Sequence, residues 1–105
     1  MPETFYEIPV SRREIDRARL IECVVVDRDG LPVEGVRLDL RIENDGTFDI
    51  DTAVTTKQLV SGGSGLAYVT WWEFPRYGAR RDFISRLRVS WEDESLRVWV
   101  DNLQE

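Results

Sequence analysis

The chain contains no histidine and only one cysteine, and these two absences exclude several classes of active site. Histidine is the commonest general base near neutral pH and the commonest metal ligand. The single cysteine, Cys23, cannot form an internal disulfide or a thiolate metal site. The sequence also lacks a phosphate-binding loop, a nucleophile elbow and a Ser/His/Asp set. We therefore expect a protein that is not an enzyme and that holds no metal or cofactor.

Long apolar runs are also lacking. No window approaches the ~18 consecutive apolar residues of a membrane span. The first twenty residues carry charges throughout, where a signal peptide needs an apolar core. If Met1 is a native start, we expect a cytoplasmic protein or a virion component, whereas a domain cut from a longer chain could come from a cell surface. The net charge of -6 argues against binding to nucleic acid or to an anionic membrane.

Alternation of apolar and polar residues with a period of two is the strongest positive signal in the sequence. Residues 36–42 place Val36, Leu38, Leu40 and Ile42 on one side and three charged residues on the other. Such a pattern is typical of a strand with one buried and one wet face.

The same alternation recurs along the chain. Residues 83–91 and 96–101 alternate clearly, and we expect them to form a hairpin around a loop at residues 92–95. Three weaker runs predict further strands, at residues 20–26, 51–60 and 66–74. Cys23 lies inside the first of these runs, so we expect a buried small apolar residue and not a reactive thiol.

The number and spacing of these strands predict the fold class. Short strands with turn signals about every ten residues, and no long helical periodicity, predict an all-β protein. We expect an immunoglobulin-like antiparallel β-sandwich of about seven strands over residues 20–105. Residues 1–19 fit two alternatives: a short helix with Ser11 and Glu14 as a capping box, or an arm that adds a strand at a sheet edge.

Three segments, in chain order, strengthen this expectation. Residues 24–38 contain a strand, an Asp-x-x-Gly-x-Pro-Val turn and a second strand, followed by Thr-Thr at 55–56 and Gly-Leu-Ala-Tyr-Val at 65–69. Together they resemble the bacterial immunoglobulin-like repeats of the invasin and intimin type (Big-1-like), and more loosely carboxypeptidase-regulatory and other prealbumin-like sandwiches. The resemblance implies a rigid, non-catalytic module that spaces or presents a binding surface. This chain contains a single copy of the pattern and many large aromatic residues near residues 71–72. Neither feature is typical of a domain that serves only as a spacer.

Four aromatic residues form the candidate binding surface. The resemblance directs Trp71 and its alternate neighbours inward, so Tyr68, Trp72 and Phe74 would face outward. Trp99 is outward by alternation in its own strand. An exposed stripe of these four rings would need a partner, either a protein or sugar rings that stack on it. The alternative is that residues 1–19 fold over the rings and bury them.

Charge is distributed unevenly along the chain. Acidic residues dominate between residues 20 and 56, whereas Arg80, Arg81, Arg86 and Arg88 lie in a basic region. One hypothesis is that copies dock acidic end to arginine end, as a homo-oligomer or a larger assembly. The alternative is a set of intramolecular surface pairs, each of little value.

Two acidic pairs were considered as calcium ligands, Asp27 with Asp29 and Asp49 with Asp51. Their spacing does not match a calcium loop, which needs more acids at defined offsets, so we expect turn residues. The expected function is a non-enzymatic structural or binding module working through protein contacts, such as a virion decoration or tail protein. The alternatives are a carbohydrate-binding module and a domain of a cell-surface adhesin.

Overall fold

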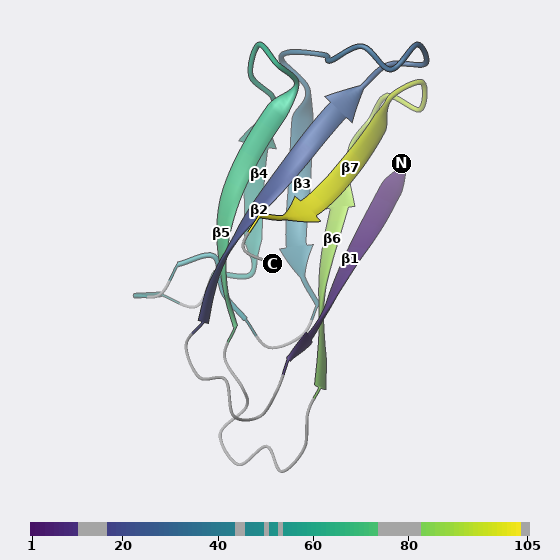
Figure 1. Cartoon of the computed structure of the whole chain (residues 1–105). Coiled ribbons are helices and arrows are strands. Elements are labelled where there is room, and N and C mark those ends of the chain that lie inside the picture. Colours follow the sequence, from purple (N-terminus) through teal and green to yellow (C-terminus); the bar gives the residue numbers. More distant parts are fainter. Residues whose placement is uncertain (11–16, 44–45, 50, 53, 74–82, 104–105) are drawn as a thin grey trace.

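The computed structural model describes residues 1–10, 17–43, 46–49, 51–52, 54–73 and 83–103, and these form seven strands with no helix among them (Figure 1). The predicted all-β architecture is confirmed. The strands are β1 (Glu3–Val10), β2 (Arg17–Val26), β3 (Arg37–Ile42), β4 (Thr56–Val60), β5 (Leu66–Glu73), β6 (Phe83–Ser90) and β7 (Arg97–Asn102).

The strands form two antiparallel sheets. One has four strands in the order β1-β6-β3-β4, and the other has three in the order β5-β2-β7. Only β3 and β4 are neighbours both along the chain and within a sheet, so every other connection passes from one sheet to the other. This arrangement is β-sandwich-like.

The inner faces of both sheets contribute to one core. Alternate residues of β2, β3, β5, β6 and β7 are buried in a single cluster, and Tyr6 of β1 and Leu59 of β4 pack against it partly buried. Ile21, Val25, Leu38, Leu87 and Val89 are fully buried within it. Burial of each such side chain contributes about 1.5–3 kcal/mol relative to exposure. Side chains from both sheets thus pack into one apolar core.

The predicted hairpin of residues 83–91 and 96–101 is wrong. Strand β6 lies between β1 and β3, whereas β7 pairs with β2 in the other sheet. The connection bends through a turn in which the Leu96 amide donates to the Asp93 carbonyl at 3.1 Å. Strands β6 and β7 each have one apolar face. Two such strands can bury these faces as neighbours in one sheet or from opposite sheets across the core. Alternation specifies the buried face and not the neighbouring strand.

Residues 3–10 form an edge strand, which was one of the two alternatives for the N-terminal segment. Strand β1 pairs along its whole length with β6, from Glu3 opposite Ser90 to Val10 opposite Phe83. Ser11 and Glu14, the predicted capping box, lie outside the described residues. Of the strand predicted at residues 51–60, only β4 is found.

Both acidic pairs serve turns. The Asp27 carboxylate accepts hydrogen bonds from the amides of Asp29 (2.9 Å) and Leu31 (3.0 Å). The Asp49 carboxylate accepts one from the amide of Asp51 at 2.9 Å. Short polar side chains of this kind stabilise turns by bonding the backbone two residues on. Asp27 and Asp49 therefore stabilise turns, as the sequence predicted.

Candidate functional site

The outer face of the three-stranded sheet is the first candidate surface. Strand β2 is central, with Glu22 opposite Tyr68 of β5 and opposite Asp101 of β7. One step along, Val24 lies opposite Leu66 and Trp99. We call this surface the Trp99 face, and its outward residues include Leu20, Glu22, Val24, Leu66, Tyr68, Thr70, Trp72, Arg97, Trp99 and Asp101.

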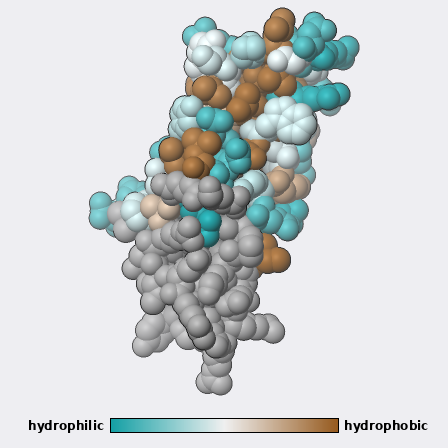
Figure 2. All heavy atoms as spheres, viewed as in Figure 1, coloured by the Kyte–Doolittle hydropathy of each residue, from teal (hydrophilic) through white to brown (hydrophobic). Residues whose placement is uncertain are grey.

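The Trp99 face is largely apolar and open to solvent. Trp99 is 62% exposed and Tyr68 is 47% exposed. Leu20, Val24 and Leu66 are half-buried and do not belong to the core cluster. Figure 2 views this side of the molecule and shows hydrophobic atoms grouped over its upper part, with hydrophilic atoms among and around them. A surface of this kind is typical of an interaction site.

Residues 3–10 do not cover these rings, because β1 belongs to the other sheet. Tyr68 and Trp72 share the outward side of β5, as the sequence predicted, but Trp72 is half-buried opposite Ala18. Tyr68 and Trp99 lie two strands apart, about 10 Å from the strand spacing. Phe74, the fourth predicted member, lies outside the described residues. The described rings therefore flank β2 and do not form one continuous stripe.

Two carboxylates lie between the rings. Glu22 and Asp101 are directly opposite each other on neighbouring strands, an arrangement that is unfavourable for like charges. The side-chain hydrogen bond from Tyr68 to Glu22 raises the pKa of Tyr68, and desolvation and the charge of Glu22 act in the same direction. This pair was not predicted from the sequence. Alternation marks both residues as outward, but the register of β2 against β7 is not a local property of the sequence.

The outer face of the four-stranded sheet is the second candidate surface. Arg41 of β3 lies directly opposite Arg88 of β6 and opposite Thr56 of β4. We call this surface the Arg41 face, and its outward residues are Glu3, Phe5, Glu7, Arg37, Asp39, Arg41, Thr56, Gln58, Val60, Ile84, Arg86, Arg88 and Ser90.

The predicted interface arginines of this face have carboxylates nearby. Arg88 lies 2.8 Å from the carboxylate of Glu3 and 4.0 Å from that of Glu43. Arg86 lies 3.8 Å from Glu7 and 3.7 Å from Glu43. Such exposed pairs are worth about 0–1 kcal/mol each. Arg86 and Arg88 thus both form intramolecular surface pairs, which was the alternative to docking between copies. Arg80 and Arg81, also proposed as interface residues, lie outside the described residues.

Arg41 differs from its neighbours. Within the described part of the chain its guanidinium has no carboxylate partner. The nearby carboxylate of Asp39 lies 3.3 Å from Arg37 instead. Arg41 borders a shallow hollow of about 520 Å³ whose lining includes Thr56, Gln58 and Arg88. The other lining residues are Asp39, Leu40, Lys57 and Ser90, so the hollow carries three cationic side chains and one carboxylate.

The remaining groups of chemical interest among the described residues are the Cys23 thiol and the acidic side chains. Burial raises the pKa of the Cys23 thiol to about 12, with a further contribution from the charge of Glu22. A thiol of this kind stays protonated and is a poor nucleophile at neutral pH. Its predicted burial is confirmed. Among the described side chains, no three or more His, Cys, Asp or Glu residues lie close enough to hold a metal ion. The described segments also include no helix long and apolar enough to cross a membrane.

No family model, curated protein or solved structure significantly matches this chain. The resemblance to bacterial immunoglobulin-like repeats therefore stays a prediction. The two outer faces are the candidate functional surfaces of the described chain.

Proposed function

We propose that this protein is a non-catalytic binding module that engages a protein partner through the Trp99 face. The single observation that supports this most is the 62% exposure of the Trp99 ring on a largely apolar sheet face. Exposed tryptophan and tyrosine are the residues that most often dominate binding energy at protein interfaces. The absence of histidine from the chain and the protonated state of Cys23 agree with a role that involves no catalysis.

Site-specific photo-crosslinking, carried out in the cells that naturally make this protein, tests this proposal. A photoreactive phenylalanine analogue at Trp99 should give a defined protein adduct. The same analogue at Leu31 should not, although Leu31 is 60% exposed, because it lies in the loop between β2 and β3 and on neither outer face. Equal adducts at both positions, or none at either, would contradict a partner on the Trp99 face.

A Trp99→Ala variant provides the energetic test. Its melting temperature should change little, because the ring is mostly exposed, whereas affinity for the crosslinked partner should fall at least about tenfold. Leu31→Ala is the matched control, since it also truncates an exposed apolar side chain. Normal affinity in Trp99→Ala would remove the main support for the proposal.

Carbohydrate is the second candidate ligand, and one observation favours it. Tyr68 and Trp99 flank Glu22 and Asp101, so flat rings border hydrogen-bond acceptors on one face. Sugars offer apolar ring faces and hydroxyl donors that fit such a surface. Binding on a glycan array that is lost in Trp99→Ala and kept in Leu31→Ala would favour this candidate over a protein partner.

A further inference from the structure

We infer that the partner of the Trp99 face is the Arg41 face of a second copy of this chain, so that copies stack face to face. The inference rests on the proposed function, because it names the occupant of the same surface. It begins from two unfavourable features, one on each sheet. The Trp99 face sets two carboxylates opposite each other, and the Arg41 face does the same with two guanidinium groups.

The spacing of the two pairs is the same. Glu22 and Asp101 are directly opposite on adjacent antiparallel strands, and so are Arg41 and Arg88. Directly opposite residues have Cβ atoms about 4.5–5.5 Å apart in any antiparallel pair. When the faces meet, each guanidinium can therefore receive one carboxylate. Charge-assisted hydrogen bonds of this type are about twice as strong as neutral ones.

One member of each pair is available for a partner. Within the described chain, Arg41 and Asp101 have no ion pair or side-chain hydrogen bond. The other members, Arg88 and Glu22, already have partners within the chain. Arg88 lies 2.8 Å from the carboxylate of Glu3, and Glu22 accepts a hydrogen bond from the Tyr68 hydroxyl. Arg41 and Asp101 are therefore the main electrostatic anchors, and docking would relieve the repulsion within both pairs.

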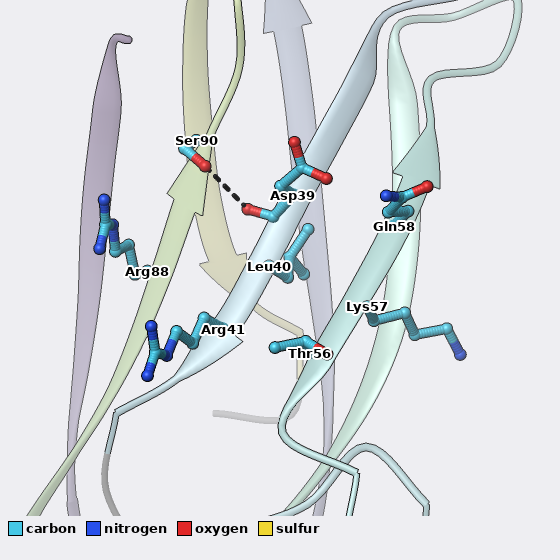
Figure 3. Close-up of a pocket in the computed structure, with 8 residues that line it drawn as sticks. All are labelled: Asp39, Leu40, Arg41, Thr56, Lys57, Gln58, Arg88 and Ser90. Atoms are coloured by element: carbon cyan, nitrogen blue, oxygen red, sulfur yellow. Dashed lines mark hydrogen bonds between the residues drawn. The ribbon is translucent and has the colours of Figure 1, made fainter.

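The surroundings of the anchors are also complementary. Figure 3 shows the guanidinium groups of Arg41 and Arg88 extending to the same side of the hollow, whereas Lys57 points away from them. Trp99 lies two residues from Asp101, on the same side of β7. A docked Asp101 would bring the Trp99 ring close to the arginines, where an indole face attracts a guanidinium.

The apolar edges of the Arg41 face add contact area. Val60 is 64% exposed, Ile84 is 54% exposed and Phe5 is 38% exposed. These side chains lie around the arginine pair and can contact the apolar residues of the Trp99 face.

The topology determines the kind of assembly that results. The two faces are the outer surfaces of the two sheets, so they lie on opposite sides of one molecule. Contact between unlike faces is heterologous and repeats from copy to copy, giving a stack or a closed ring. Each copy of two sheets would add roughly 20 Å, because packed sheets are about 10 Å apart.

Sedimentation equilibrium at low salt is the first test. The wild-type mass should rise with protein concentration, and the association should weaken as salt screens the ion pairs. Arg41→Glu should weaken it at least about tenfold, and the double change Glu22→Lys with Asp101→Lys should do the same. Arg28→Glu is the matched control, because it makes the same charge change in the exposed turn after β2 and should associate normally.

A mixing experiment makes the test specific. Arg41→Glu keeps a normal Trp99 face, and the double lysine variant keeps a normal Arg41 face. Each variant alone should stay monomeric, whereas an equimolar mixture should associate again through the two unchanged faces. Circular dichroism in the tryptophan region confirms that both variants are folded. If the double variant does not fold, Asp101→Lys alone replaces it.

Three results would overturn the inference. These are a wild-type protein that is monomeric at all concentrations, an association that neither variant weakens, and a mixture that fails to associate. The proposed function is tested separately. A monomeric protein that still forms a defined adduct with a different protein at Trp99 retains the binding role and loses only the second copy as partner.

Discussion

At the residue scale, the buried hydroxyl of Thr47 organises the irregular segment before β4. The Oγ1 atom lies 2.9 Å from the carbonyl oxygen of Thr52 and accepts a hydrogen bond from the amide of Val54 at 2.9 Å. Thr47→Val removes these part-buried hydrogen bonds and leaves the Val54 amide with its bond to the Thr52 carbonyl oxygen. We expect the free energy of unfolding to fall by about 1–3 kcal/mol, measured by chemical denaturation. Thr70→Val, at an exposed position of β5, is the control, and an equal loss there would contradict the explanation.

Gly65 allows a close approach of two chain segments. It has a φ of 73°, and an added Cβ would lie 2.5 Å from the carbonyl oxygen of Val25. Gly65→Ala should therefore lower the melting temperature clearly, since both the backbone angle and the contact oppose a side chain. Gly63→Ala is the matched change in the same loop, where an added Cβ meets nothing within 4 Å. Similar melting temperatures for the two variants would refute this role.

Asp93 provides a prediction about pH. The hydroxyl and amide of Ser95 donate to its carboxylate at 2.6 and 2.9 Å and hold the pKa of Asp93 below its ordinary value, with a smaller contribution from the charge of Arg28. A lowered pKa means that the contribution to stability is present above the ordinary pKa and is lost as pH falls through the lowered one. In Ser95→Ala, an NMR titration should show the pKa of Asp93 shifted upward. An unchanged titration midpoint would argue against the hydroxyl as the main cause.

At the element scale, the strands depend on uninterrupted apolar inner faces. Leu38 is fully buried in β3, which lies between two other strands. Leu38→Asp places a charge there without a partner, so the domain should unfold, and Val89→Asp should do the same from β6. Loss of the cooperative thermal transition is the measurement. Gln58→Asp adds the same charge at an exposed site of β4 and should melt normally. A normally melting Leu38→Asp protein would disprove the strand assignment.

How well each strand could be predicted depended on the pattern of apolar and polar residues within that strand. Residues 36–42 were recognised nearly to their limits, because four apolar residues at a spacing of two allow one interpretation. Residues 51–60 were overextended, since Thr-rich sequence is compatible with a strand but does not require one. There, the Thr47 hydroxyl bonds the backbone of Asp49, Thr52 and Val54, and these hydrogen bonds compete with strand pairing.

At the scale of the whole molecule, β1 protects one long edge of β6. Removal of residues 1–10 would expose this edge and delete the ion pair between Glu3 and Arg88. Exposed edges pair readily with other chains. We expect a lower melting temperature and salt-insensitive aggregation, measured by light scattering. A truncated protein that is stable and monomeric would show that β1 is dispensable for the fold.

The candidate site could be predicted only in part. Alternation identified the outward ring Trp99, because orientation within one strand is a local property, whereas the outward side of Tyr68 came from the resemblance. The pairing of Glu22 with Asp101 and of Arg41 with Arg88 could not be deduced, since each pair joins strands far apart in the sequence. Residues 22 and 101 are brought together only by the central position of β2.

The sequence by itself determined the strand class, the buried side of most strands and the burial of Cys23, because these depend on side-chain periodicity within short segments. The tertiary structure alone decided that β6 and β7 belong to different sheets, that β1 lies on β6, and which like charges face each other. Strand partners depend on hydrogen bonds between segments distant in the chain, and many registers satisfy the same alternation. The shared core selects one of them, since it buries both apolar faces at once.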